Sequence, residues 1–174
     1  MREVPSPEIE MNENSLVNLF LEKAAEAGAA TDTVNSAQEL QRIFSEVLWE
    51  HGSVYCPCMT DKERAVPIPA DRRQPAYESA SITIEESFAG VAETGTVICS
   101  SASGKFLQAS LLPEHHVAIV PREKIFPTFS EFFASLAEMP TNITLITGPS
   151  RTADIEKTLI IGMHGPKRVT VIVW

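Results

Sequence analysis

The chain has 174 residues, of which 44% are hydrophobic and 21% charged, and its formal net charge is -9. This composition predicts one packed domain and excludes a disordered protein, because a core of ordinary size can form. The acidic balance argues against a nucleic-acid partner and against attraction to an anionic membrane surface, since both need basic residues. The first residues lack an export signal and no run of about 18 apolar residues occurs, so we expect a cytoplasmic protein without a membrane partner.

The N-terminal half predicts an arm followed by helices. Residues 1–13 are rich in proline and glutamate, which predicts a loose arm before a single domain over 14–174. Apolar residues at helical spacing predict helices over 15–27 and 36–51, the second opened by a capping box, and a short strand follows at 53–56.

A polar, proline-containing stretch over 59–78 comes next. Such a length without secondary structure is typical of a lid or binding loop. Its basic pair, Arg72 and Arg73, either closes over an anionic ligand or remains a solvated pair of charges.

The second half alternates strands with helices. The pattern predicts strands over 81–84, 96–99, 116–120, 143–147 and 169–174, an acidic helical turn over 85–88, and helices over 128–139 and 152–160. The apolar, β-branched strand over 143–147 is typical of the inside of a parallel sheet. Interleaved strands and helices predict an α/β fold with a mainly parallel sheet flanked by helices.

The three cysteines, Cys56, Cys58 and Cys99, point to no redox centre. An odd count disfavours a disulfide framework, and the first two have CxC rather than CxxC spacing. A cubane iron–sulfur cluster takes four thiolates, so we expect no intrinsic iron–sulfur cluster. The sequence identifies no cofactor, and we predict no metal site.

The run ITGPSRTADIE, residues 146–156, is the densest polar motif of the chain. Gly148 suits a tight turn, Ser150 or Thr152 can cap a following helix, and free amides at a helix start attract anions. Arg151 adds a guanidinium that suits a carboxylate or phosphate. The alternative is a capped turn without a ligand, because Asp154 and Glu156 already satisfy the helix dipole.

Further candidates lie in three other loops. Glu93, before the flexible Thr94-Gly95 turn, is a candidate general base or nucleophile, or else a structural carboxylate bonded to backbone amides. His164 and Gly165 form a loop in which an imidazole can act as an acid or base at neutral pH. Ser110 is the only polar contributor of a tight apolar connection. The residues that we expect to contact the ligand are Thr94, Gly95, Ser110, Gly148, Ser150, Arg151, Thr152, Asp154 and Gly165.

Four blocks in the second half carry a family resemblance. They are AETGT at 92–96, SLLP at 110–113, ITGPSRTADIE at 146–156 and GMHGP at 162–166. In this order and spacing the chain resembles the LUD-domain family, and within it the lactate utilization C proteins. The resemblance implies a NagB/RpiA/CoA-transferase-like fold and a component of an L-lactate to pyruvate oxidation system that works with iron–sulfur partner proteins.

Several alternatives stay open at this stage. Either His115 or His116 occupies the family's histidine position after SLLP, with His115 favoured by its spacing. We expect an anionic small molecule as ligand, but the sequence does not decide whether the chain is an enzyme. The other hypotheses are an autonomous CoA-transferase-like, isomerase-like or folate cyclo-ligase-like enzyme, and a non-catalytic interaction subunit.

Overall fold

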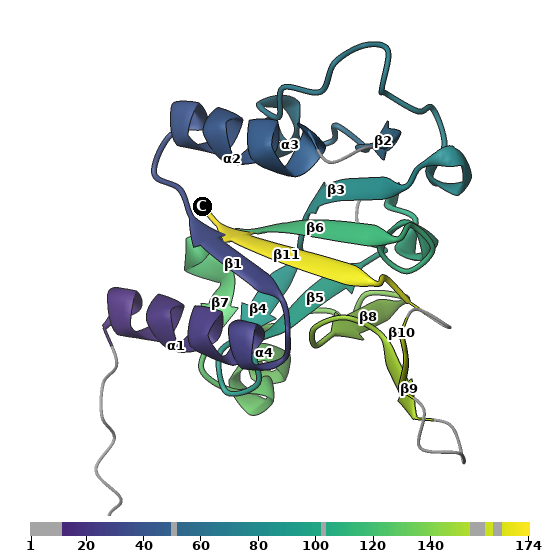
Figure 1. Ribbon diagram of the computed structural model, residues 1–174. Coiled ribbons are helices and arrows are strands. Elements are labelled where there is room, and N and C mark those ends of the chain that lie inside the picture. The colour runs from purple at the N-terminus through teal and green to yellow at the C-terminus, as the bar shows by residue number, and fades with distance from the viewer. Residues whose placement is uncertain (1–11, 50–51, 102–103, 154–158, 162–164) are drawn as a thin grey trace, which may run out of the picture.

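The computed structural model describes residues 12–49, 52–101, 104–153, 159–161 and 165–174, and most of the predicted arm lies outside them. Figure 1 shows a larger and a smaller sheet with helices around them, and β9 and β10 as a separate two-stranded pair. The helices are α1 (Glu13–Glu26), α2 (Ala37–Trp49), α3 (Asp61–Arg64) and α4 (Phe129–Ser135). The strands are β1 (Ala30–Thr33), β2 (Val54–Tyr55), β3 (Ile82–Glu86), β4 (Ala89–Val91), β5 (Thr96–Ser100), β6 (His115–Val120), β7 (Ile125–Phe126), β8 (Ile143–Ile146), β9 (Arg151–Ala153), β10 (Leu159–Ile161) and β11 (Arg168–Val173).

The main sheet has the order β1-β11-β6-β3-β2, and every neighbouring pair is parallel. One of its faces packs against α2, where Leu40 and Phe44 meet Ile119 and Ile172 in one core cluster. The other face meets α1 and a second sheet, where Phe20, Val97 and Val171 share another cluster. The prediction of an α/β fold with a mainly parallel sheet flanked by helices is confirmed.

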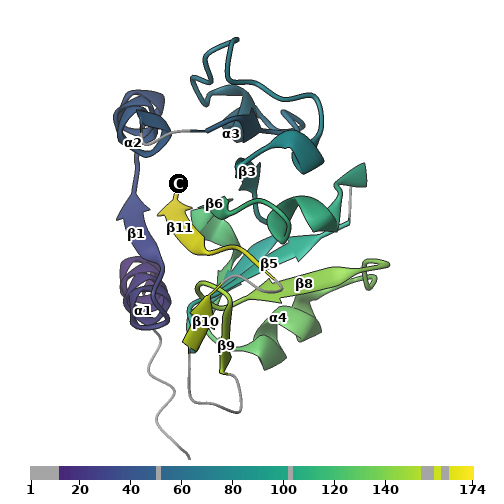
Figure 2. The ribbon, with the colours of Figure 1, turned by 45° about the vertical axis from the view of Figure 1, so that its right-hand side comes forward.

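The second sheet has the order β7-β4-β5-β8 and includes antiparallel pairs. Figure 2 shows the resulting layers: α2 and α3, the main sheet, the second sheet and α4. Phe132 of α4 packs on Val91 and Ile98 of this sheet in a third cluster. The molecule therefore buries apolar side chains on both sides of each sheet.

The helix starts predicted from capping patterns in the sequence agree with the structure. The backbone N–H of Glu39 donates to Ser36 Oγ at 3.2 Å, and its carboxylate accepts from the backbone N–H of Asn35 at 2.8 Å. Thr128 Oγ1 likewise accepts from the N–H of Glu131 at 3.2 Å at the start of α4. Gly28, at φ 96°, ends α1 as expected of a left-handed stop. No helix of the described ranges is long and apolar enough to cross a membrane.

Three predicted elements were wrong. The helix over 152–160 is not formed at either end, because Arg151–Ala153 and Leu159–Ile161 pair as the antiparallel strands β9 and β10. The strand over 143–147 is not inside a parallel sheet: β8 is an edge strand antiparallel to β5, and Leu145 is exposed. The acidic turn over 85–88 is not helical: Glu85 and Glu86 are the last residues of β3, and Glu85 is buried against His116 rather than solvated.

Candidate functional site

The ITGPSR segment lines a cleft of about 470 Å³ between the end of β8 and the loop before β11. The backbone N–H of Ser150 donates to the carbonyl of Pro166 at 2.9 Å, which holds these two loops together. The cleft is also lined by Ala27 at the end of α1, Leu111, Leu145 and Gly165. Residues of the SLLP, ITGPSRTADIE and GMHGP blocks thus meet at one cleft.

The end of α1 supports this cleft through two glycines. Gly148 has φ 69°, and a Cβ there would overlap the carbonyl oxygen of Ala27. Gly28 has φ 96°, and a Cβ there would overlap the guanidinium of Arg151. Gly148 needs glycine because its positive φ and the nearby backbone of Ala27 both exclude a side chain, whereas Gly28 needs glycine for its positive φ alone, since the end of the flexible Arg151 side chain can move aside. The guanidinium of Arg151 therefore packs against Gly28, where the chain turns after α1.

Arg151 provides the positive charge of the cleft. Its side chain is exposed, and no carboxylate of the described residues forms an ion pair with it. Asp154 and Glu156, its expected competitors, lie outside the described residues, as does His164. Because Arg151–Ala153 form β9 rather than the start of a helix, no helix dipole is available here, and anion binding would depend on the guanidinium and the nearby hydroxyls.

A chain of hydroxyls joins the AETGT block to the cleft. Thr94 Oγ1 lies 2.7 Å from Thr96 Oγ1, which lies 2.7 Å from Thr147 Oγ1. Thr96 is buried, whereas Thr94 and Thr147 are exposed at the two ends of this chain. The structure thus connects Thr94 with Gly148, Ser150, Arg151 and Gly165, all of them predicted ligand-binding residues.

Other predicted site residues lie elsewhere. Glu93 accepts a hydrogen bond from the backbone N–H of Phe129 at 2.8 Å, at the start of α4, as expected of a structural carboxylate. Gly95 is buried under α1, and the hydroxyl of Ser110 donates to the carbonyl of Leu107 at 2.7 Å inside the protein. Thr152 belongs to β9, but its side chain lies outside the described residues. Their catalytic and binding roles stay predictions.

Neither histidine after SLLP lines this cleft. The two rings point to opposite faces of β6: His115 Nε2 lies 2.9 Å from Thr170 Oγ1, and His116 Nε2 lies 3.0 Å from Glu85 Oε1. His115 is buried, and this burial lowers its pKa to about 4, with smaller contributions from the charges of Arg168 and His116.

A second cleft, of about 220 Å³, lies at the carboxyl end of β3 in the main sheet. In open parallel sheets this edge is where ligands usually bind, and the sequence had placed ITGPSRTADIE there. Its lining consists of Met59, Thr60, Glu85, Glu86, Ser87, Phe88, Ser100, Lys105 and Lys124. Of the basic pair in the predicted long loop, Arg73 instead donates to Cys58 Sγ at 2.9 Å.

Two buried groups behind this second cleft were missed by the sequence reasoning. Glu63, fully buried, accepts from Lys105 Nζ at 2.7 Å. Cys99 is buried beside Glu85 and His116, and burial raises the pKa of its thiol well above the usual value, so it is not an activated nucleophile. The one signal for this region in the sequence was Glu85, a charged residue within the apolar strand SITIEE, where it alternates with isoleucines.

Comparison with known proteins agrees with the predicted resemblance. The family model described as LUD domain matches residues 66–174. Lactate utilization protein C of Macrococcus caseolyticus is 43% identical over 103 residues, which cover 55% of this chain and 45% of that protein. The protein of the same name from Halalkalibacterium halodurans is 40% identical over 141 residues, covering 77% and 54%. The chain therefore spans about half the length of these relatives.

A solved structure shows the same fold. The crystal structure of a DUF162 family protein from Deinococcus radiodurans superimposes with a TM-score of 0.67 and covers 94% of this chain and 98% of that chain. The two sequences are 22% identical, so this likeness concerns the fold alone.

Proposed function

This chain belongs to the LUD domain family, and from that premise we propose that it is a lactate utilization component that binds a small anion in the cleft around Arg151. The relatives' shared name supports a role in lactate utilization, and within it we propose the oxidation of L-lactate to pyruvate. In this proposal the two electrons released by lactate pass to iron–sulfur partner proteins and the two protons pass to solvent, and the chain contributes anion binding, docking or a non-redox step.

One observation carries the binding part of the proposal. The guanidinium of Arg151 sits on Gly28 at a cleft that also exposes the Thr147 hydroxyl and half-exposes Ser150. A guanidinium matches the two oxygens of a carboxylate, while hydroxyls suit the 2-hydroxyl or keto oxygen of a short hydroxy or keto acid. In a chain of net charge -9, such a local cation favours entry of an anion.

Titration calorimetry with L-lactate, pyruvate and inorganic phosphate tests the binding site. We expect one saturable site for at least one of these anions, weakened about 10- to 100-fold by Arg151→Ala, because a charge-assisted hydrogen bond contributes about 1.5–3 kcal/mol. Arg122→Ala is the matched control, since this arginine donates to Asn14 Oδ1 away from the cleft. Equal affinity in all three proteins would exclude the cleft as the binding site.

A genetic experiment tests the lactate role separately. Deletion of the gene is expected to abolish growth on L-lactate, with restoration by the wild-type chain and by Arg122→Ala. Arg151→Ala should restore it poorly if the cleft binds the relevant anion. Normal growth of the deletion strain on L-lactate would contradict the lactate role, whatever the calorimetry shows.

A further inference from the structure

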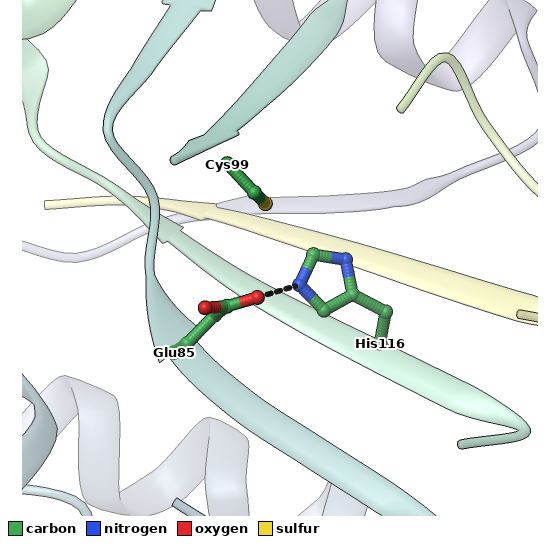
Figure 3. A group of neighbouring side chains, drawn as sticks. All are labelled: Glu85, Cys99 and His116. Atoms are coloured by element: carbon green, nitrogen blue, oxygen red, sulfur yellow. Dashed lines mark hydrogen bonds and ion pairs between the residues drawn. The ribbon is translucent and has the colours of Figure 1, made fainter. Parts of the chain in front are cut away.

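Glu85, Cys99 and His116 converge between the two sheets, from β3, β5 and β6 respectively (Figure 3). Their exposed fractions are 4%, 2% and 0%. We call these three side chains the Glu85 cluster. Three ionisable groups of different chemistry rarely meet in a protein interior without a hydrogen-bonding or ligand-binding reason, because burying them costs free energy.

The Glu85 cluster has the dimensions of a metal site. One carboxylate oxygen, one sulfur and one imidazole nitrogen all lie within 4.8 Å of one another, and the Glu85 Oε1 to His116 Nε2 distance is 3.0 Å. Zinc bonds of about 2.0–2.3 Å in tetrahedral geometry place ligand atoms about 3.3–3.8 Å apart. Small side-chain rotations are therefore enough to bring the three atoms around one ion.

We propose that Glu85, Cys99 and His116 bind a divalent transition metal of the zinc class, with one coordination position left for water or an anion. The mixture of thiolate, imidazole and carboxylate disfavours Mg²⁺ and Ca²⁺, which take oxygen ligands, and is a common donor set for Zn²⁺. A carboxylate, a thiolate and a neutral imidazole around a divalent cation have zero net charge, which suits a buried site.

The surroundings of His116 supply a second, independent observation. Its Nδ1 is buried without a hydrogen-bond partner in the described structure, and the same holds for Thr83 Oγ1. Thr83 is the register partner of His116 across the β3–β6 pair. A metal-bound histidine normally donates its other ring N–H to an acceptor, and Thr83 provides an unused one on the adjacent strand.

The second cleft gives the Glu85 cluster an access route. Glu85 belongs to both, and Ser100, the residue after Cys99, also lines the cleft. Lys124 also lines the cleft, as does Lys105, whose ammonium pairs with the buried Glu63, so an anion that enters would approach the open coordination position past the Lys124 ammonium. This inference does not depend on anion binding at Arg151, which lies in the other cleft.

Cobalt titration of chelator-treated protein tests the proposal, because Co²⁺ reports its ligands by absorption. We expect one equivalent of Co²⁺, tetrahedral d–d bands and a thiolate-to-cobalt charge-transfer band, all displaced by Zn²⁺. Cys99→Ala should remove the charge-transfer band and weaken Co²⁺ binding at least about 100-fold, since a lost ligand costs more than a lost outer-shell partner. The matched control is Cys56→Ala/Cys58→Ala, which removes the other two thiols and should leave the spectrum unchanged.

Two further variants guard against unfolding of Cys99→Ala. Cys99→Ser and His116→Gln preserve size and a polar atom, and circular dichroism verifies their fold before titration. Both should lose the tetrahedral spectrum while remaining folded. Absence of stoichiometric binding by the wild-type protein would overturn the proposal and leave an ordinary hydrogen-bonded cluster. A charge-transfer band that disappears only with Cys56 and Cys58 would overturn it as well, by assigning the metal to that pair.

Discussion

Among single residues, His115 makes the stability of the protein depend on pH. Its folded-state pKa is lowered to about 4, chiefly by burial, against about 6.5 in an unfolded chain. Between these pH values the unfolded state binds a proton that the folded state does not. The free energy of unfolding should therefore be unaffected by His115 above about pH 6.5 and fall by up to about 3 kcal/mol as pH drops towards 4.

Urea unfolding between pH 4 and pH 8 measures this loss of stability. His115→Gln retains a polar group facing Thr170 but cannot be protonated in this range, so its unfolding free energy should fall less steeply on acidification. Parallel pH curves for the variant and the wild type would show that His115 does not titrate as described.

Hydrogen bonds of single residues differ in whether the sequence predicts them. The bond between Thr128 and Glu131 was predictable because the partners are three residues apart and belong to a known helix-start pattern. The bond from the backbone of Phe129 to Glu93 spans 36 residues, so no local pattern revealed it. The sequence therefore left open whether Glu93 is a general base, a nucleophile or a carboxylate bonded to backbone amides, and only the fold shows that α4 supplies such an amide.

Between elements, the contact of α1 with the β4–β5 turn depends on Gly95. This residue has φ 65°, and a Cβ there would overlap the backbone of Lys23 and Ala24. Gly95→Ala should destabilise the protein by about 2–4 kcal/mol, because the left-handed conformation and the displaced helix each add a cost. Chemical denaturation followed by circular dichroism measures the change in unfolding free energy.

Gly104→Ala is the control that separates these two costs. Gly104 also has a positive φ, 79°, but no described atom lies within 4 Å of a Cβ built there. It should cost only the backbone term, about 1–2 kcal/mol. Equal losses of unfolding free energy in the two variants would show that the close packing of α1 on Gly95 adds no cost.

The strands β9 and β10 show why element type was hard to predict in this region. Residues 152–160 contain apolar positions compatible with a short helix, and a Gly-Pro turn precedes them as it precedes many helices. The pairing of 151–153 with 159–161 decides in favour of strands. Such pairing is a contact between separate segments, which periodicity over a few residues cannot resolve.

In the whole molecule, alternation of strands and helices predicted the main sheet but not the second one. The sequence order does not reveal that β5 and β8 pair with each other outside the main sheet. For this reason the ITGPSR loop was placed at the carboxyl edge of the parallel sheet, where the structure has the cleft of Glu85 and Lys105. The family motifs nevertheless meet around Arg151, since Ser150 contacts Pro166 and Thr147 contacts Thr96.

Glu63 joins three distant parts of the molecule. Its Oε1 accepts from Lys105 Nζ at 2.7 Å and from the backbone N–H of Glu86 at 2.8 Å, and its Oε2 accepts from the N–H of Met59 at 2.7 Å. Lys105 Nζ also donates to the carbonyl of Glu86 at 2.6 Å. The segment before α3, the end of β3 and the segment before Leu107 are thus held at one buried carboxylate.

This arrangement predicts a large difference between buried and exposed ion pairs in the same molecule. Glu63→Gln should lower the unfolding free energy by about 3–5 kcal/mol, because it leaves the largely buried Lys105 uncompensated. The double variant Glu63→Gln/Lys105→Met should lower it by less than the sum of the two single changes, because the two residues interact directly. The control pair, Lys167 and Glu114, has a similar 2.6 Å distance but side chains that are 51% and 63% exposed, so Glu114→Gln should change the unfolding free energy far less than Glu63→Gln does. Urea unfolding of the variants gives all these values, and a cost for Glu63→Gln as small as that for Glu114→Gln would mean that the Glu63 contacts do not hold the three segments together.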